Sequence, residues 1–161
     1  MKKAIIIGCP GAGKSTFSRA LKEKTGLPLY HLDMLFWNAD KTQVSREVFD
    51  ERLSHVLEQE KWIIDGNYSR TLKKRLQACD TVFLLDFPVD VCMSGAVERI
   101  GKSRSDMPWI ENELDKDFEN FILNFSQNEL PKIYLLLNEQ VDKKIIIFKS
   151  RKDVEDYLCS N

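Results

Sequence analysis

Residues 4–16 read AIIIGCPGAGKST, an apolar run that passes directly into a turn containing three glycines, a lysine and two hydroxyl residues. The consecutive isoleucines before Gly8 are typical of a buried strand. After the turn, Phe17, Ala20 and Leu21 recur at helical spacing, and Gly26 is a typical end of a helix. This stretch therefore predicts a strand, a glycine-rich turn and a helix, in that order.

The turn fits the pattern GxxxxGKS, the P-loop, from Gly8 to Ser15. Glycines let successive backbone N–H groups point inward around phosphate oxygens, and the positive end of the following helix adds to the attraction. Lys14 can reach the β- and γ-phosphates, and the Ser15 hydroxyl can bind Mg²⁺. The alternative is a glycine-rich turn with a surface lysine, which the strand and helix context disfavours. We expect a triphosphate site formed by Gly8, Gly11, Ala12, Gly13, Lys14, Ser15 and Thr16.

The composition indicates one globular domain spanning residues 1–161, with 43% hydrophobic and 30% charged residues. The net charge of −1 lacks the basic excess that proteins use to hold a long nucleic acid, so direct DNA binding is not expected. The four cysteines form no CxxC pair and suit a reducing compartment. No apolar run is long enough for a membrane span. We therefore expect a cytoplasmic protein without a membrane partner.

Short β-branched runs alternate with amphipathic segments along the chain. The predicted strands cover residues 3–8, 29–32, 61–64, 81–85 and 144–148, and the predicted helices cover 15–25, 45–60, 71–79, 89–100, 111–127, 129–140 and 152–159. This alternation is typical of a parallel sheet with helices on both faces. Ligands of such α/β folds bind at the carboxyl ends of the strands.

Acidic residues follow three of the predicted strands. Asp65, with Gly66 directly after it, is the favoured residue to hold Mg²⁺ through water. Asp86 is the competitor, although it can equally be an ordinary turn residue. Asp33 lies beside an aromatic wall that includes Trp37, where a carboxylate can orient a hydroxyl or accept its proton. A turn or N-cap residue is the alternative interpretation of Asp33.

The segment RIGKSR at 99–104 places three cations in a polar loop. Phosphoryl transfer spreads negative charge over several oxygens, and cations on a closing loop stabilise that charge while the loop excludes water. A solvated basic loop is the alternative. We predict a lid at about 99–110, with Arg99 and Arg104 acting in catalysis beside Lys14 and Asp33.

These segments together resemble the adenylate-kinase-like group of P-loop kinases, and within it the bacterial topology modulation proteins, which are FlaR-related. The resemblance depends on GCPGAGKST at 8–16, HLDMLFW at 31–37, WIIDGNYSRTL at 62–72, TVFLLDFP at 81–88 and RIGKSRSDM at 99–107. It implies a three-layer α/β/α P-loop NTPase fold with five parallel strands in the order 2-3-1-4-5, and ATP bound at residues 8–16. It also implies an acceptor segment at about 33–60, an acceptor contact from Arg70, and base contacts from Lys149 and Arg151.

The acceptor region departs from that of adenylate kinases. Three residues separate Gly66 from Arg70, where adenylate kinases have DGFPRT, and the only cations near 34–45 are Lys41 and Arg46. A nucleoside monophosphate usually needs several cations, so a small hydroxylated molecule, as in shikimate or gluconate kinases, fits Asp33 at least as well. The expected substrate-binding residues are Asp33, Trp37, Asp65, Gly66 and Arg70.

The predicted function is therefore an ATP- and Mg²⁺-dependent kinase that phosphorylates a hydroxylated metabolite, a nucleoside or a nucleotide. The sequence leaves the acceptor and the oligomeric state open. The alternative function is a nucleotide-dependent regulator of DNA topology. Its support besides the resemblance is the basic run RTLKKR at 70–75, which we interpret as a solvated helix face.

Overall fold

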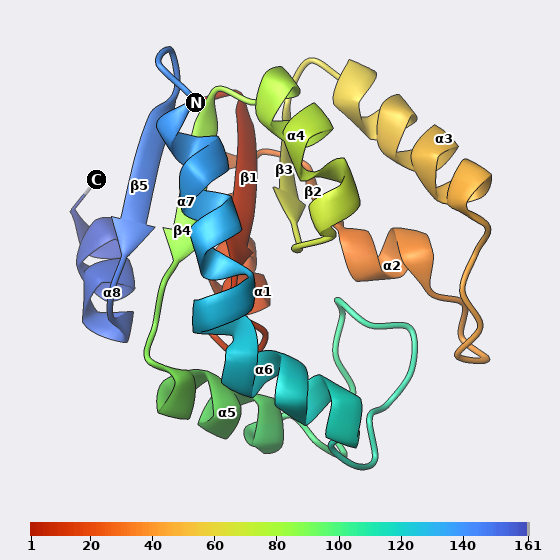
Figure 1. The fold of residues 1–161 in the computed structure, drawn as a ribbon. Coiled ribbons are helices and arrows are strands. Elements are labelled where there is room, and N and C mark those ends of the chain that lie inside the picture. The colour runs from red at the N-terminus through yellow and green to blue at the C-terminus, as the bar shows by residue number, and fades with distance from the viewer. Residues whose placement is uncertain (161) are drawn as a thin grey trace.

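A five-stranded parallel sheet forms the middle layer of the protein in a computed structural model that describes residues 1–160 (Figure 1). The strands are β1 (Lys3–Gly8), β2 (Leu29–His31), β3 (Trp62–Asp65), β4 (Thr81–Leu85) and β5 (Lys144–Phe148). Their order is β2-β3-β1-β4-β5, and all neighbouring strands are parallel. The predicted fold class and strand order are confirmed.

Helices cover both faces of this sheet. They are α1 (Lys14–Thr25), α2 (Leu32–Phe36), α3 (Arg46–Glu58), α4 (Ser69–Ala78), α5 (Val89–Glu98), α6 (Lys116–Asn128), α7 (Leu130–Asn138) and α8 (Arg151–Cys159). Figure 1 shows α4 and α7 in front of the sheet and α1 behind it, and α8 packs beside α1 and β5. Within residues 1–160, no helix combines the length and the apolar character needed to cross a membrane.

The core lies between the sheet and its helices. Ile5, Ile6 and Ile7 are fully buried because β1 is the central strand and helices cover both of its sides. Behind the sheet, the ring of Phe17 packs edge-on against those of Phe83 and Phe148, with centroids 5.0 and 5.3 Å away. These contacts fix α1, and therefore the turn that precedes it, against the sheet.

The strand register brings the predicted site residues to one edge. His31 lies opposite Asp65 in the β2–β3 pair, and Gly8 lies opposite Leu85 in the β1–β4 pair. The residues that follow these strand ends therefore share the carboxyl edge of the sheet, as expected for a doubly wound fold.

Several predicted boundaries differ from the structure, and two of the differences bear on the site. Strand β2 ends at His31, so Asp33 lies in the first turn of α2 rather than at the end of a strand. Helix α6 begins at Lys116, five residues later than predicted, because the Asp115 side chain accepts hydrogen bonds from the N–H groups of Asp117 and Phe118 and caps the helix there.

Candidate active site

The P-loop leaves the N-terminus of α1 open for an anion. Gly13 precedes the helix in a left-handed conformation with a φ of 95° and has no side chain to cap it. The first turn contains Lys14, Ser15 and Thr16 and no acidic residue. The unpaired N–H groups and the positive end of the helix dipole therefore face the turn without a competing carboxylate from this helix.

Gly11 is required because the P-loop packs directly on the backbone of α5. A Cβ on Gly11 would lie 1.9 Å from the carbonyl oxygen of Cys92, and a Cβ on Gly95 would lie 2.0 Å from the carbonyl oxygen of Gly11. Gly11 also has a φ of 83°, which side chains disfavour. The loop and α5 are thus in backbone-to-backbone contact at these two glycines.

A cleft of about 470 Å³ opens over the P-loop. Its walls come from the P-loop, from α8 and from the lid segment, which we define as residues 99–115 between α5 and α6. Of the residues predicted to bind the nucleotide or act on it, those that line the cleft are Gly11, Ala12, Gly13, Lys14, Ser15, Thr16, Arg99, Arg104 and Arg151. Gly8 and Lys149 do not line it.

Lys14 lies under the cleft, with its ammonium held by its own loop. Lys14 Nζ donates to the carbonyl oxygens of Gly8 and Cys9 at 2.9 and 3.1 Å. Burial lowers the pKa of Lys14, while the negative charge of Asp65 opposes the shift. The ammonium therefore sits at the base of the loop, in the place from which a P-loop lysine binds phosphate oxygens.

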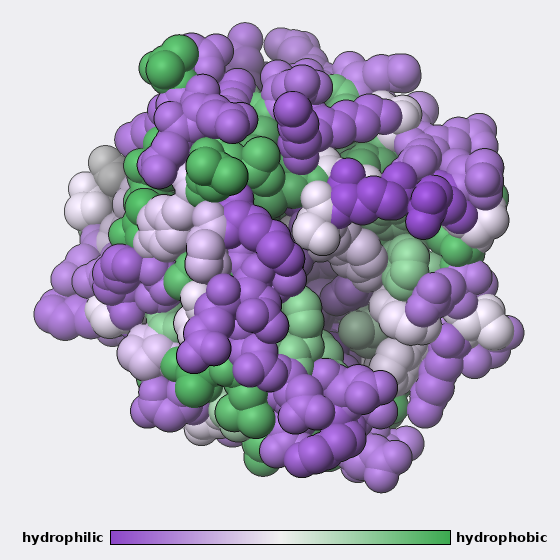
Figure 2. All heavy atoms as spheres, in the orientation of Figure 1, coloured by the Kyte–Doolittle hydropathy of each residue, from purple (hydrophilic) through white to green (hydrophobic). Residues whose placement is uncertain are grey.

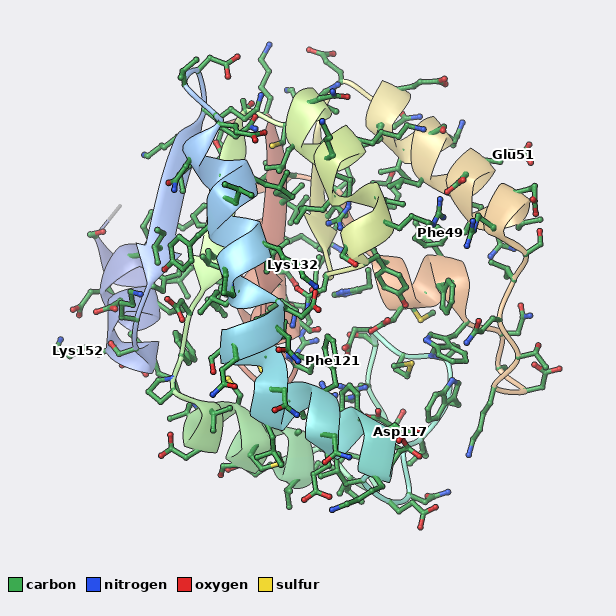
Figure 3. The ribbon with its side chains drawn as sticks, viewed as in Figure 1. Phe49, Glu51, Asp117, Phe121, Lys132 and Lys152 are labelled. Atoms are coloured by element: carbon green, nitrogen blue, oxygen red, sulfur yellow. The ribbon has the colours of Figure 1, made fainter. Side chains whose placement is uncertain are left out.

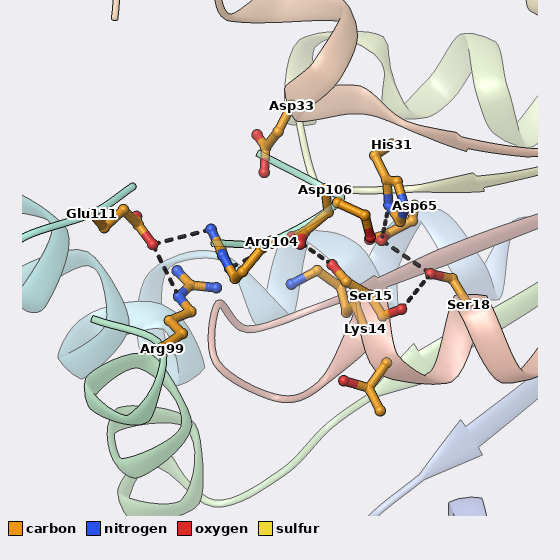
Figure 4. A network of polar contacts seen from close by, with 12 residues as sticks. Lys14, Ser15, Ser18, His31, Asp33, Asp65, Arg99, Arg104, Asp106 and Glu111 are labelled. Carbon is orange, nitrogen blue, oxygen red and sulfur yellow. Dashed lines mark hydrogen bonds and ion pairs between the residues drawn. The ribbon is translucent and has the colours of Figure 1, made fainter. Parts of the chain in front are cut away.

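Asp65 belongs to a buried polar network beside the P-loop (Figure 4). Its Oδ2 accepts a hydrogen bond from Ser18 Oγ at 3.2 Å and lies 2.8 Å from His31 Nδ1. Ser18 Oγ also donates to the Ser15 carbonyl oxygen at 3.0 Å. Ser18 thus links Asp65 to the backbone of Ser15, and hydroxyl and carboxylate oxygens are ligands that suit Mg²⁺.

The Asp86 side chain is engaged away from the P-loop, by Tyr134 of α7 and by Lys149, which follows β5. Its Oδ2 accepts a hydrogen bond from the Tyr134 hydroxyl at 2.6 Å and contacts the Lys149 ammonium. Asp86 does not line the P-loop cleft. Asp65 is therefore the better placed of the two candidates for a metal, and Lys149, which was predicted to contact the base, is engaged by Asp86 instead.

The lid arginines lie over the cleft, held by a residue that the sequence analysis did not identify. The Glu111 carboxylate lies 3.4 Å from Arg99 Nε and 3.0 Å from Arg104 Nη2 (Figure 4). The Gly101 N–H also donates to the Glu111 carbonyl oxygen at 2.6 Å. Glu111 thereby closes the lid segment on itself and fixes the two guanidinium groups next to each other.

Asp106, in the middle of the lid segment, was also missed. It is only 4% exposed, and its Oδ2 accepts a hydrogen bond from Ser15 Oγ at 2.8 Å. Burial raises the pKa of Asp106, but the positive charge of Arg104 and the hydrogen bond from Ser15 outweigh burial and lower it overall. A carboxylate in a loop next to a predicted cationic cluster was the one signal that could have indicated this residue.

Asp33 and Tyr68 form the acceptor side of the site. The Tyr68 hydroxyl donates to Asp33 Oδ1 at 2.5 Å. Burial raises the pKa of Asp33, and the hydrogen bond from Tyr68 opposes the shift. Burial also raises the pKa of Tyr68, so this hydroxyl keeps its proton. The charges of Lys14 and Arg99 act on Asp33 from across the same space (Figure 4).

Aromatic rings surround this carboxylate. The Tyr68 ring packs against those of Phe36 and Phe49, with centroids 5.0 and 5.3 Å away. Trp37, predicted to contact the substrate, meets Trp109 of the lid segment edge-on at 6.0 Å. The lid segment and the acceptor segment therefore touch through two tryptophans.

Arg70, the predicted acceptor contact, lies outside the site. Its guanidinium pairs with Asp50 of α3 at 2.6 Å and is half-exposed. Gly66, also predicted to bind substrate, lies in the turn after β3 with a φ of 135°, and its carbonyl oxygen accepts a hydrogen bond from Arg75 at 2.9 Å.

Arg75 corrects the interpretation of the basic run at 70–75. This run was predicted to form a solvated face, which is wrong for Arg75, because that residue is fully buried. Its guanidinium also donates to the carbonyl oxygens of Asn67 and Tyr68, and burial lowers its pKa to about 10. Arg75 therefore holds the turn that carries Tyr68, while Lys73 and Lys74 are exposed as predicted.

A second hollow, of about 260 Å³, lies between α4 and the pair α6 and α7, on the face shown in Figure 2. Asn67 and Tyr68 line it from the turn before α4, and Phe121 and Lys132, labelled in Figure 3, line it from α6 and α7. Asn67 also exchanges hydrogen bonds with the N–H and the carbonyl of Gly8, at 3.0 and 2.7 Å. Tyr68 therefore lines this hollow with part of its surface and donates to Asp33 with its hydroxyl.

Comparisons with known proteins identify the class of fold. Chains of shikimate kinase from Bacteroides thetaiotaomicron and from Acinetobacter baumannii, the latter in complex with shikimate, superpose with TM-scores of 0.65 and 0.64. They are 19% and 16% identical to this chain, and the superpositions cover 98% and 99% of it and 94% and 90% of those chains. The fold is that of P-loop kinases.

Similarity in sequence is more limited. No protein-family model matches the chain. Adenylate kinases from Thermotoga neapolitana and Thermotoga maritima are each 27% identical over 88 residues, which make up 53% of this chain and 39% of each relative. The match therefore spans less than half of the length of these curated relatives.

Proposed function

We propose that the protein is an ATP-dependent phosphotransferase that phosphorylates a small hydroxylated acceptor. The observation that carries the proposal is a shared edge of the sheet: a P-loop and two lid arginines line one cleft, and the charges of Lys14 and Arg99 act on the half-buried Asp33. The kinase fold and the partial similarity to adenylate kinases support it.

The P-loop and the lid segment would hold the triphosphate. Backbone N–H groups from Gly11 to Ser15 surround the phosphate oxygens, and Lys14 neutralises their charge. Arg99 and Arg104 reach the transferring group from the opposite wall of the cleft. The Ser15 hydroxyl and, through water, Asp65 would hold Mg²⁺, which would neutralise phosphate charge when bound.

Asp33 would accept the proton of the acceptor hydroxyl. Tyr68 holds Asp33 Oδ1, and within residues 1–160 no group donates a hydrogen bond to Oδ2, which leaves that oxygen for the acceptor. The acceptor oxygen forms a bond to the γ-phosphorus, the bond from that phosphorus to the β–γ bridging oxygen breaks, and the proton passes to Asp33. The products are ADP and the phosphorylated acceptor.

The surroundings of Asp33 favour an acceptor without its own phosphate. Arg70 is paired with Asp50 on the surface, and the Tyr68 ring, whose hydroxyl donates to Asp33, packs against Phe36 and Phe49. The fold is shared with a shikimate kinase whose structure is a complex with shikimate. A hydroxylated metabolite or a nucleoside therefore agrees better with the site than a nucleotide.

The test is ADP formation from ATP and Mg²⁺ with a panel of hydroxylated metabolites and nucleosides. We expect turnover with at least one acceptor, and a loss of about 10²-fold or more in Lys14→Ala and Asp33→Asn. Lys22→Ala, an exposed lysine on the same helix, is the matched control and should keep full turnover. Full turnover in the Lys14 and Asp33 variants would disprove the assignment.

The second candidate function is a nucleotide-dependent regulator of DNA topology, which follows from the resemblance to topology modulation proteins. A direct role on DNA would have to use exposed cations such as Lys73 and Lys74 on α4. Binding to duplex DNA that weakens as salt is added would support it, and no binding at low salt would remove it.

A further inference from the structure

We propose that Asp106 is a positioning residue for magnesium: it holds the Ser15 hydroxyl in the orientation that binds the metal, so that closure of the lid segment and metal binding favour each other. This inference rests on the proposed function, because it requires a nucleotide and Mg²⁺ at the P-loop.

The geometry places a lid carboxylate directly on the P-loop serine. Asp106 and Ser15 are 91 positions apart, yet Ser15 Oγ donates to Asp106 Oδ2 at 2.8 Å (Figure 4). Asp106 lies 3.5 Å from Arg104 Nη1 and 3.9 Å from Arg19 Nη1. A carboxylate is buried at a cost unless it is paired, and these three partners supply the pairing.

The chemistry of a hydroxyl explains why this contact matters for a metal. A serine hydroxyl has one proton to donate and two lone pairs to offer. When the proton is donated to Asp106, the lone pairs of Ser15 Oγ are directed away from the carboxylate and remain available for a cation. A bound cation polarises the O–H bond and makes its hydrogen bond to a carboxylate stronger, as for other metal ligands with a carboxylate behind them.

The carboxylate at the end of β3 does not take this role. Asp65 Oδ2 is engaged by Ser18 Oγ and His31 Nδ1, and within residues 1–160 the hydroxyl of Ser15 donates to Asp106 alone. The proton acceptor for the metal-binding hydroxyl therefore comes from the lid segment rather than from the sheet.

Because Asp106 belongs to the lid segment, the position of this segment and the affinity of the site for Mg²⁺ are coupled. If closure of the lid segment improves the metal site, the metal must favour closure by the same factor. Closure can be followed by fluorescence, because Trp109 of the lid segment contacts Trp37 of the acceptor segment. The Trp109→Phe variant identifies how much of the signal comes from this residue.

The deciding experiment measures ADP affinity by calorimetry with Mg²⁺ and with a chelator. In the unaltered protein we expect Mg²⁺ to tighten ADP binding. In Asp106→Asn, which keeps the shape and removes the charge, we expect this tightening to shrink by about 10-fold to 100-fold, the usual loss when the partner of a metal ligand is removed. Affinity without Mg²⁺ should stay equal or rise, because a negative charge near the phosphates has been removed.

Two variants serve as comparisons. Asp106→Glu keeps the charge and should restore part of the Mg²⁺ effect. Glu113→Gln removes an exposed carboxylate from the same lid segment and should leave the Mg²⁺ effect unchanged.

The outcomes separate the alternatives. An equal loss of ADP affinity with and without Mg²⁺ in Asp106→Asn would mean that Asp106 only holds the lid segment against the P-loop. That result would overturn the inference. An unchanged Mg²⁺ effect would do the same. In the unaltered protein, Mg²⁺ added to the ADP complex must change Trp109 fluorescence, and no change would refute the coupling even if the variants fail to fold. No ADP binding at all by the unaltered protein would instead refute the proposed function.

Discussion

Replacing Tyr68 with phenylalanine tests the electrostatics of the acceptor side. The change removes one hydroxyl, which donates to Asp33 Oδ1 at 2.5 Å, and keeps the ring that packs against Phe36 and Phe49. A hydrogen bond to a charged group contributes about 1.5–3 kcal/mol. The bond is stronger to the ionised carboxylate than to the neutral carboxyl group, so losing it raises the pKa of Asp33. The direction is upward because Tyr68 lowers this pKa in the unaltered protein.

The stability consequence depends on pH in a defined direction. Burial raises the pKa of Asp33 in the folded state above its unfolded value, so ionisation of Asp33 opposes folding, and stability falls as pH rises through the folded-state pKa. Tyr68 offsets part of this fall. We therefore expect Tyr68→Phe to reduce the free energy of unfolding by about 0.5–1.5 kcal/mol in acid and by about 1.5–3 kcal/mol once Asp33 is ionised.

Urea unfolding at a series of pH values, followed by tryptophan fluorescence, measures this difference. The acidic limb of kcat/KM for the identified acceptor should move to higher pH if Asp33 is the base. Tyr134→Phe is the matched control, because Tyr134 also donates to an aspartate, Asp86, at 2.6 Å, and Lys149 still contacts that aspartate after the change. A stability loss in Tyr68→Phe that does not grow with pH, or an acidic limb that moves down, would refute the reasoning.

Three further changes probe the scaffold. Gly11→Ala places a Cβ 1.9 Å from the Cys92 carbonyl oxygen, and we expect a loss of about 3 kcal/mol in stability together with loss of ADP binding; a normal melting temperature would contradict this. Phe49 is 2% exposed, so Phe49→Ala leaves a cavity and should lower the free energy of unfolding in urea by about 3–5 kcal/mol. The control Glu51→Ala, on the outward face of the same helix (Figure 3), should change this free energy by no more than about 0.5 kcal/mol. Ser150→Ala removes the N-cap of α8 and should cost about 1 kcal/mol, seen as faster amide exchange in that helix; unchanged exchange would count against the cap.

The layered fold and the P-loop are predictable because their signals are local. Central parallel strands need apolar side chains on both faces, so β1 and β4 stand out as continuous apolar runs whose predicted bounds agree with the structure. The P-loop combines glycines, a lysine and a hydroxyl at fixed spacing between a strand and a helix. The N-cap of α3 is a similarly local feature, because the Ser45 side chain accepts a hydrogen bond from the Val48 N–H three residues later.

The parts that could not be predicted depend on contacts between distant segments. Asp106 and Glu111 lie in a polar stretch without periodicity, and their importance comes from Ser15 and from the lid arginines. Arg75 looks like its exposed neighbours in sequence, and only its position on α4 directs it inward to the turn after β3. Arg70 differs from its expected role for the same reason. The resemblance predicts that it contacts the acceptor, but its guanidinium pairs with Asp50 on the surface of α3.

The contact between Gly11 and Gly95 has a consequence for motion. A side chain at either position would collide with backbone atoms, which cannot rotate aside, so the loop and α5 have no room to slide past each other. Helix α5 ends at Glu98, directly before Arg99. We expect the phosphate-binding turn and the foot of the lid to travel as one rigid piece, with bending confined to the residues beyond Arg99.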